Sequence, residues 1–236
     1  MGGTTAALPQ IQAGRPVILV MGRTPHLGRV KTRLARTLGR RAALRLHQAF
    51  LRDTLHLAQS AARTMGGHAV MAYAGPAPSA EHNLPAVHSF QQCCGDLGRR
   101  QTHAQDLLFR LSAGAVITIG SDSPTLPANR ILSAWQDRSS ADLLVVPAAD
   151  GGYALLSHTR PLPDIYREVP WGTSRALAAL STRATSGRLT LRRMEPWYDI
   201  DDNADLQRLR QELAIDPGRA PCTAEALDAL SLGPDA

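Results

Sequence analysis

The chain has few aromatic residues and few cysteines. Phe, Trp and Tyr make up 4% of its 236 residues, although 44% of the residues are hydrophobic. Of the three cysteines, Cys93 and Cys94 are adjacent and Cys222 stands alone, so the spacing predicts neither a disulfide framework nor a zinc site. The length is enough for one domain, or one and a half, with a substantial buried core.

Long apolar runs are also missing. No stretch approaches the ~18 consecutive apolar residues that a membrane span needs, and the N-terminal residues lack the apolar core of a signal peptide. We therefore expect a cytoplasmic protein without a membrane partner. Residues 1–15 show no periodicity and are predicted to be a disordered lead-in.

Positive charge exceeds negative charge, with a formal net charge of +6. The basic residues are scattered along the chain, except for a concentration between residues 23 and 41. Scattered charge does not predict a nucleic-acid surface. Anionic small molecules are the partners that this distribution favours.

Apolar runs alternate with helical patterns along the chain, and the runs are of the kind that is buried on both faces of a parallel sheet. The predicted strands are 17–21, 69–73, 87–90, 115–120, 143–146, 153–156 and an edge strand at 189–194. The predicted helices cover about 41–65, a segment through 107–111 that ends near 114, 128–137, 203–213 and 224–230. A further helix is predicted to begin after a cap at Thr173 or Ser174. This alternation predicts a three-layer α/β/α domain with a mainly parallel sheet over 16–215, followed by a C-terminal tail with a short helix over 216–236.

A basic, glycine-containing turn follows the first predicted strand. Backbone N–H groups in such a turn can surround phosphate oxygens, and Arg and Lys add charge-assisted hydrogen bonds. The turn is not a Walker A loop, because Arg29 and Val30 separate Gly28 from Lys31. A solvated basic turn is the alternative. The phosphate-binding candidates are Gly22, Arg23, Gly28, Arg29, Lys31 and Arg33.

Aspartates follow several later strands, and they are the candidates for a metal site. They are Asp122, Asp150, Asp199 and Asp201. Parallel topology brings the carboxyl ends of strands to one edge of the sheet. Carboxylates at that edge, opposite a basic turn, suit Mg²⁺ or Mn²⁺ held by a few acids and by substrate phosphates. Helix capping is the alternative for any single aspartate, and we expect it of Asp202.

Six motifs in this order resemble a known family. They are residues 28–34 (GRVKTRL), 95–98 (GDLG), 120–124 (GSDSP), 150–153 (DGGY), 170–174 (PWGTS) and 197–201 (WYDID). The series is similar to the glycosyltransferase A-like family of radical-SAM/selenodomain-associated transferases, over about residues 17–210. The molybdenum cofactor guanylyltransferases and the phospholactate guanylyltransferases are also similar, and these attach a nucleoside monophosphate to a phosphate and release pyrophosphate.

The resemblance implies a nucleotide-diphospho-sugar transferase fold (GT-A, Rossmann-like), with the nucleotide at the basic turn and at Gly95 and Asp96. It implies a metal at Asp122, helped by Asp201 or alternatively by Asp199. The implied catalytic residues are Lys31, for charge on the phosphates, Asp122, and Asp150, as a base or as a carboxylate that positions the second substrate. The acceptor candidates are Asp150, Gly151, Gly152, Trp171, Gly172 and Thr173, although Trp171 has core packing as its alternative.

The chain departs from the family pattern at several positions. Arg23 replaces the usual lysine and Leu27 the usual proline, and Cys93 and Cys94 stand where glycines commonly precede Gly95. An arginine still serves a phosphate, with different geometry. The two cysteines put a close backbone approach to a ligand in doubt.

These observations predict a metal-dependent transferase with a nucleotide-diphosphate donor, and three functions stay open. A glycosyltransferase would use a nucleotide sugar and a small-molecule acceptor. A nucleotidyltransferase would use a nucleoside triphosphate and a phosphorylated small molecule, and would release pyrophosphate. A non-catalytic nucleotide-binding protein would bind without turnover, against which the acids Asp122 and Asp201 argue. The family resemblance favours sugar transfer, and the fold alone does not choose.

Overall fold

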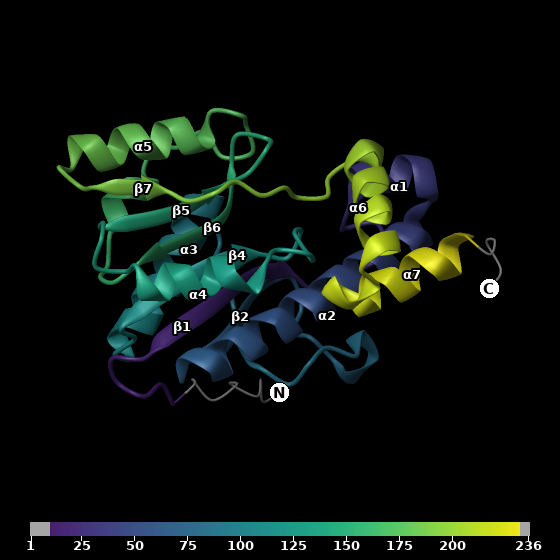
Figure 1. Ribbon diagram of the computed structural model, residues 1–236, viewed down its shortest axis with the longest axis horizontal. Helices are drawn as coiled ribbons and strands as arrows, with labels where there is room; N and C mark the ends of the chain where they lie inside the picture. The colour runs from purple at the N-terminus through teal and green to yellow at the C-terminus, as the bar shows by residue number, and fades with distance from the viewer. Residues whose placement is uncertain (1–9, 232–236) are drawn as a thin grey trace.

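A seven-stranded sheet forms the centre of the computed structural model, which describes residues 10–231 (Figure 1). The strands are β1 (Pro16–Arg23), β2 (His68–Ala74), β3 (His88–Gln91), β4 (Ala115–Gly120), β5 (Leu143–Pro147), β6 (Tyr153–His158) and β7 (Leu191–Arg193), in the order β3-β2-β1-β4-β6-β5-β7. The pairings of β6 with β4 and β5 are antiparallel, and the other pairings are parallel. The prediction of a mainly parallel sheet is confirmed.

Helices cover both faces of this sheet. The helices of the described residues are α1 (Thr32–Leu38), α2 (Arg40–Met65), α3 (Leu97–Arg110), α4 (Ala128–Gln136), α5 (Ala176–Ser186), α6 (Asn203–Ile215) and α7 (Pro221–Ser231), with short 3₁₀ turns at Ala80–His82, Pro163–Tyr166 and Pro217–Arg219. Apolar side chains of α2 and α4 pack on one face of the sheet, and those of α3 and α5 pack on the other. The predicted three-layer α/β/α architecture is therefore confirmed.

The strand β1 shows why the apolar runs become central strands. Side chains alternate between the two faces of a strand. Ile18 and Val20 pack with α2 and α4, whereas Val17 and Leu19 pack with α3. All four side chains are fully buried, so an uninterrupted apolar run is what this position requires.

A third group of helices lies at one end of the sheet, where α1, α6 and α7 gather against α2 (right-hand side of Figure 1). The carboxylate of Asp53, in α2, accepts hydrogen bonds from the backbone N–H groups of Cys222 and Thr223 at 3.0 and 2.7 Å, at the start of α7. The segment expected as a C-terminal tail therefore contains the predicted short helix, and this helix shares the core.

Several local predictions differ from the structure. The helix α1 was not predicted, because in its seven residues only Leu34 is buried and no apolar stripe can be recognised. The helix α5 begins at Ala176, two residues after the predicted cap, and Thr173 instead accepts a hydrogen bond from the backbone N–H of Arg175 at 3.3 Å. Asp202 caps α6 as predicted, by accepting from the N–H groups of the next turn.

The predicted disordered lead-in falls partly on residues 1–9, which lie outside the described residues. Residues 10–15 are held in place, since the N–H of Gly14 donates to the carbonyl of Ser112 at 2.9 Å and that of Gln12 donates to His68 at 3.1 Å. Among residues 10–231, none of the helices combines the length and the apolar character needed to cross a membrane.

Candidate active site

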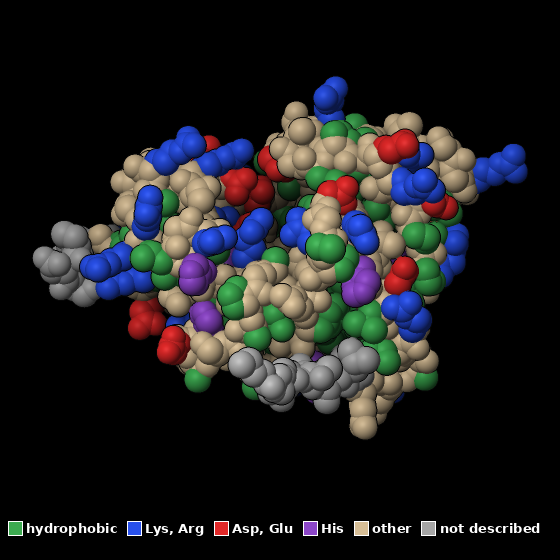
Figure 2. Space-filling view, turned by 180° about the vertical axis from the view of Figure 1, so that it is seen from behind, with side chains coloured by type: hydrophobic (Ala, Val, Ile, Leu, Met, Phe, Trp, Pro, Cys, Tyr) green, Lys and Arg blue, Asp and Glu red, His purple; other side chains and the backbone are tan. Residues whose placement is uncertain are grey.

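A cleft of about 680 Å³ opens at the edge of the sheet where β1, β4 and β5 end. Figure 2 shows acidic and basic side chains gathered around a hollow on one face of the molecule. The segment after β7 crosses the same edge: the N–H of Ile200 donates to the carbonyl of Asp122 at 2.9 Å, and Ala148 forms a bridge with Trp197. Parallel topology thus brings together turns that are distant in sequence, as predicted.

One side of the cleft is basic. We call it the basic half, and its Lys and Arg residues are Arg23, Arg29, Lys31, Arg33 and Arg100. Within the described part of the chain, Arg23 and Arg29 form no ion pair, and both are exposed. Arg33 is 69% exposed and lies 3.6 Å from a carboxylate oxygen of Asp201. Most of this positive charge is therefore available to an anion in the cleft.

Lys31 is the buried member of the basic half. Its side chain is 5% exposed, and its ammonium lies 2.8 Å from Asp122 and 3.7 Å from Asp201. It also donates to the carbonyl of Ile200 at 2.6 Å. The backbone of Lys31 is left-handed, with φ 44° and ψ 47°, which costs a non-glycine residue roughly 1–3 kcal/mol. This strained turn directs the ammonium into the cleft floor, where it joins three segments.

Asp122 is paired with this lysine. Its carboxylate keeps 45% of its exposure on the cleft side. Loss of water around the group acts to raise the pKa of Asp122, but the charge and hydrogen bond of Lys31, together with His47 and Arg23, outweigh this effect and lower the pKa. Asp122 is consequently an anion with a fixed partner.

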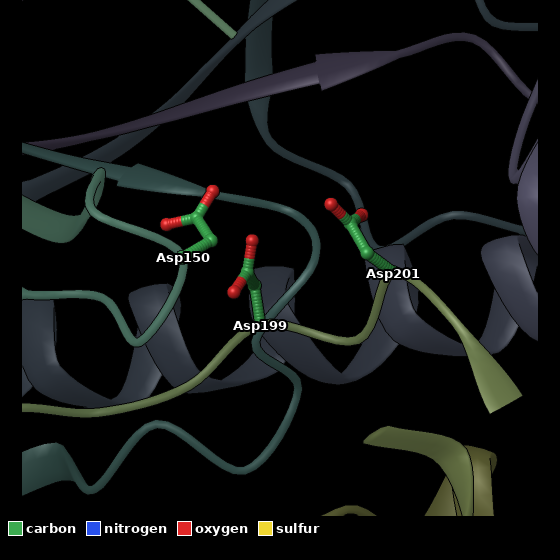
Figure 3. Close-up of side chains that lie close together, drawn as sticks. All are labelled: Asp150, Asp199 and Asp201. Atoms are coloured by element: carbon green, nitrogen blue, oxygen red, sulfur yellow. The ribbon is translucent and has the colours of Figure 1, made fainter. Parts of the chain in front are cut away.

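Three other carboxylates lie close together, those of Asp150, Asp199 and Asp201 (Figure 3). One oxygen from each falls within 4.8 Å of the others. Asp150 comes from the turn between β5 and β6. Asp199 and Asp201 flank Ile200, which is fully buried among α1, α2 and α6. Because residues two apart in an extended segment face the same way, burial of Ile200 turns both acids toward the cleft.

The acids of this cluster repel one another. Burial, and then the charges of Asp150 and Asp201, raise the pKa of Asp199 to about 6. A group of crowded carboxylates fits a divalent cation, because Mg²⁺ and Mn²⁺ take hard oxygen ligands and would relieve the repulsion. The donor set therefore suits the predicted metal, with Asp199 and Asp201 in place. Asp122, the acid that the family resemblance assigns to the metal, lies outside this cluster. Asp150, which the resemblance assigns to the acceptor, belongs to it.

The other side of the cleft is uncharged. We call it the aromatic half, formed by Gly152, Tyr153, Trp171, Gly172, Thr173 and Ala176. The rings of Tyr153 and Trp171 meet edge to face with centroids 6.4 Å apart, a favourable arrangement for aromatic pairs. The Tyr153 hydroxyl donates to Gln101 at 2.7 Å. The Thr173 hydroxyl donates to the carbonyl of Pro170 at 2.8 Å.

The residue Gly98 allows the aromatic half to close on α3. A Cβ atom at this position would lie 2.6 Å from Nε1 of Trp171 and 2.8 Å from the carbonyl oxygen of Tyr166. Both distances are below van der Waals contact, so no larger residue fits without a shift of the loop. The last glycine of the 95–98 motif thus has a packing role.

A buried polar network supports the aromatic half from behind. The side chain of Gln105 donates to Thr118 at 2.9 Å and lies 3.1 Å from Nε2 of His158. The Tyr166 hydroxyl is 3.3 Å from the same nitrogen. Burial lowers the pKa of His158 to about 4, against a smaller opposing effect of its hydrogen bond to the carbonyl of Arg160. The network is therefore neutral at physiological pH.

The carboxylate of Glu212 in α6 ties the two acidic turns together. It accepts hydrogen bonds from Tyr198, which precedes Asp199, and from Thr125, three residues after Asp122, the latter at 3.2 Å. Arg219 pairs with the same carboxylate at 2.6 Å. Burial, and then the Glu212 carboxylate, raise the pKa of Tyr198 to about 12, so its hydroxyl stays protonated and donates.

Most of the predicted site residues line the cleft, and four do not. Those in the lining are Gly22, Arg23, Arg29, Lys31, Arg33, Asp122, Asp150, Gly152, Trp171, Gly172, Thr173, Asp199 and Asp201. Asp96 instead caps α3, by accepting from the N–H of Arg99 at 2.8 Å. Gly151 packs against the backbone of Ser174, and Gly28 and Gly95 occupy positive-φ turn positions.

Sequence reasoning missed several polar residues of the lining. Gln92 donates to the carbonyls of Ala72 and Gly22 at 2.7 and 3.2 Å and accepts from Arg100 at 3.3 Å. His47, in α2, lies 3.0 Å from the carbonyl of Arg23, and burial lowers its pKa. Gln101 was the one with a usable signal, because it shares the buried face of α3 with Leu108 and Ala104.

The fold and the cleft define the class of protein, a transferase of the nucleotide-diphospho-sugar transferase fold. A structure from Desulfovibrio desulfuricans G20, provisionally described as such a transferase, is similar over 93% of this chain and 97% of its own, with 25% identity and a TM-score of 0.81. Residues 55–173 match a family model described as an uncharacterized protein conserved in bacteria (DUF2064), and the chain belongs to this family.

Two further solved structures share the fold at low identity. A CMP:2-keto-3-deoxy-manno-octonic acid synthetase solved with CTP is similar over 86% of this chain and 99% of its own, with 12% identity and a TM-score of 0.53. The 4-diphosphocytidyl-2C-methyl-D-erythritol synthase of Anaerococcus prevotii DSM 20548 is similar over 85% and 99%, with 9% identity and a TM-score of 0.54. No curated protein matches the chain.

Proposed function

We propose that this protein is a metal-dependent glycosyltransferase, which moves a sugar from a nucleotide-diphosphate donor to a small-molecule acceptor. The observation that carries the proposal is the carboxylate cluster beside the basic half. Three acids, with one oxygen of each within 4.8 Å of the others, face Lys31 and the exposed side chains of Arg23 and Arg29 across one cleft. A diphosphate is a ligand that a divalent cation and Lys or Arg side chains bind together, because each neutralises part of its charge. The resemblance to the radical-SAM/selenodomain-associated transferases supports the same assignment.

In this proposal, the diphosphate lies in the basic half, where Arg23 and Arg29 hold its oxygens. Asp199 and Asp201 would hold Mg²⁺ or Mn²⁺, which supplies Lewis-acid neutralisation of the diphosphate when bound, and the neighbouring Asp150 is left for the acceptor. Lys31 lies at the edge of the carboxylate cluster, 3.7 Å from Asp201. From there its ammonium stabilises the charge that develops on the leaving group.

The acceptor lies in the aromatic half and attacks the anomeric carbon of the donor sugar. Its hydroxyl oxygen forms the new C–O bond while the C–O bond to the diphosphate breaks, and the nucleoside diphosphate leaves with the bonding electrons. Asp150 is exposed and adjacent to Gly152 and Tyr153. It is therefore placed to orient the acceptor hydroxyl or to take its proton.

Nucleotidyl transfer is the second candidate. Five Lys and Arg side chains line the basic half, and this number would also serve a nucleoside triphosphate. In that reaction a phosphate oxygen of the acceptor attacks the α-phosphorus, and pyrophosphate leaves. The two reactions share the basic half and the metal, but they need acceptors of different charge.

A thermal-shift panel tests the proposal directly. Nucleoside triphosphates and nucleotide sugars are added with and without Mg²⁺ or Mn²⁺, because a ligand that binds only the folded state raises its melting temperature. We expect a metal-dependent shift with at least one nucleotide, and loss of the metal dependence in the Asp199→Asn, Asp201→Asn double variant. Asp164→Asn, on an exposed turn, is the matched control.

The product then separates the two candidates. Release of nucleoside diphosphate from a nucleotide sugar supports glycosyl transfer, and release of pyrophosphate from a triphosphate supports nucleotidyl transfer. A panel without any shift, or a metal-dependent shift that survives in the double variant, contradicts the assignment of the carboxylate cluster.

A further inference from the structure

Positive charge is confined to one half of the cleft. Within the described residues, every Lys and Arg of the lining comes from residues 23–33 or is Arg100. The guanidinium of Arg100 donates to the carbonyl of Asp96 and to the side chain of Gln92, and Gln92 in turn contacts Gly22 at the end of β1. Arg100 therefore belongs to the β1 side.

The aromatic half offers no cation to a ligand. Arg175, which follows residues 170–174, is not one of the described residues that line the cleft. The two side-chain hydroxyls of this half already donate within the protein, that of Tyr153 to Gln101 and that of Thr173 to the carbonyl of Pro170. Asp150 adds a negative charge at the border with the carboxylate cluster.

A phosphate in the aromatic half would be poorly stabilised. It would lose water against two aromatic rings without gaining a charge-assisted bond, and it would lie beside Asp150. An uncharged group with hydroxyls and C–H faces, by contrast, can pack against the rings of Tyr153 and Trp171 and present a hydroxyl to Asp150. The charge distribution thus discriminates between the two kinds of acceptor.

We infer that the acceptor half of the cleft takes an uncharged, hydroxyl-bearing group and excludes phosphate. This inference rests on the proposed function and names the class of its second substrate. Nucleotidyl transfer to a phosphorylated acceptor needs a second anion beside the nucleotide, whereas glycosyl transfer to a hydroxyl does not. The acceptor hydroxyl oxygen forms the new C–O bond, and its proton passes to Asp150, the second of the two roles proposed for that carboxylate above.

The test counts phosphate sites by equilibrium dialysis with inorganic phosphate. The protein is saturated with Mg²⁺ and with the nucleoside diphosphate that gives the largest metal-dependent thermal shift, so that the basic half is occupied. We expect the loaded wild-type protein to bind no phosphate. A Thr173→Lys variant, which adds a cation to the acceptor half, should gain one phosphate site, at least about tenfold tighter than any residual phosphate binding by the wild type, a factor of ten being 1.4 kcal/mol. Ser174→Lys, which adds the same charge at an exposed neighbour outside the lining, should gain none.

Two results overturn the inference. One is a phosphate site in the loaded wild-type protein that weakens on Trp171→Ala substitution, since phosphate would then bind in the acceptor half, from which the inference excludes it. The other is equal phosphate binding by Thr173→Lys and Ser174→Lys, which contradicts the placement of Thr173 beside the acceptor.

Failure of the proposed function is distinguishable from failure of this inference. If no nucleoside diphosphate binds, the proposed function fails. Phosphate binding to the basic half is then weakened by the Arg23→Gln, Arg29→Gln double substitution, which takes the place of the bound nucleotide in the dialysis experiment. Phosphate that still binds to this variant and is lost on Trp171→Ala substitution overturns the exclusion. If the double variant binds no phosphate, and gains a phosphate site when Thr173→Lys is added to it, the exclusion of phosphate from the acceptor half is supported.

Discussion

The basic half and the aromatic half of the cleft are built on the same edge of one sheet but by different means. The basic half projects exposed arginines, and its one buried cation, Lys31, is held by Asp122 and by the carbonyl of Ile200. The aromatic half has no charge, and a buried network around Gln105 and His158 supports it from behind. Charge organises one side and packing organises the other.

This contrast has a physical reason. Exposed cations tolerate displacement, because charge attraction acts over several ångströms. An uncharged ligand is recognised by contact, which falls off steeply with distance. The half that relies on contact therefore needs the more rigid walls, and the close packing at Gly98 and the hydrogen bond from Tyr153 to Gln101 supply them.

Among the substitutions that test the difference between the two halves, removal of the charge of Lys31 should have the largest effect on activity. A Lys31→Met variant keeps most of the side-chain volume but leaves Asp122 without its partner. We expect turnover to fall about 10²-fold or more, with weaker nucleotide binding and an increase in the pKa of Asp122. Steady-state kinetics and nucleotide titration measure these changes.

Arg36→Met is the control for this variant, because Arg36 is exposed in the last turn of α1 and lies outside the cleft lining. If Lys31→Met retained turnover within threefold of wild type, Lys31 would have only a structural role between the segments that it joins.

The aromatic half should respond to crowding instead. In a Gly98→Ala variant the new methyl group would lie 2.6 Å from Trp171 and 2.8 Å from the backbone of Tyr166, which costs about 1–3 kcal/mol of folding free energy. We expect the loop around Trp171 to move, so that the KM for the acceptor rises several-fold while the nucleotide affinity is unchanged. Denaturant unfolding and two-substrate kinetics measure the two effects.

Gly187→Ala is the matched control, because its nearest neighbour would lie at 3.4 Å and the residue is remote from the cleft. A Gly98→Ala protein with normal stability and normal acceptor KM would show that the loop does not depend on this close approach.

The sequence predicted the sheet better than it predicted the site. Apolar runs such as 17–20 become central strands because both faces of the sheet are covered, and this pattern is visible in one dimension. Which acids meet depends on distances that only the fold sets: Asp122 pairs with Lys31, whereas Asp150 joins Asp199 and Asp201. The short helix α1 had no stripe to recognise, since Leu34 is its only buried residue.

The aromatic half was also only partly predictable. The family motifs contain Trp171, Thr173 and Tyr153, but nothing in them indicates that Tyr153 lines the cleft or that Gln101 is its hydrogen-bond partner. A polar residue on the apolar stripe of a helix signals a buried hydrogen bond, and Gln101 and Gln105 both lie on that face of α3. The signal was present, but the identity of the partners required the structure.

The last expected effect concerns the pH dependence of folding stability and is confined to the aromatic half. Burial lowers the pKa of His158 from 6.5 to about 4, so between these values the unfolded chain binds a proton that the folded protein does not. Folding stability therefore falls as the pH decreases through this window, by a total on the order of 3 kcal/mol. A His158→Gln variant keeps a hydrogen-bonding group but cannot titrate, and its stability should depend less on pH.

The difference between wild type and variant is the quantity to measure, by denaturant unfolding at several values between pH 7 and pH 4. Asp199 contributes with the opposite sign, because its pKa is raised from 3.8 to about 6 in the folded protein. Asp199 binds its proton more tightly in the folded state, so its protonation stabilises the fold as the pH decreases. This contribution is the same in wild type and in His158→Gln. Parallel pH profiles of wild type and His158→Gln would mean that His158 is not neutral in the fold, and that the wall behind the aromatic half is not the uncharged support that distinguishes it from the basic half.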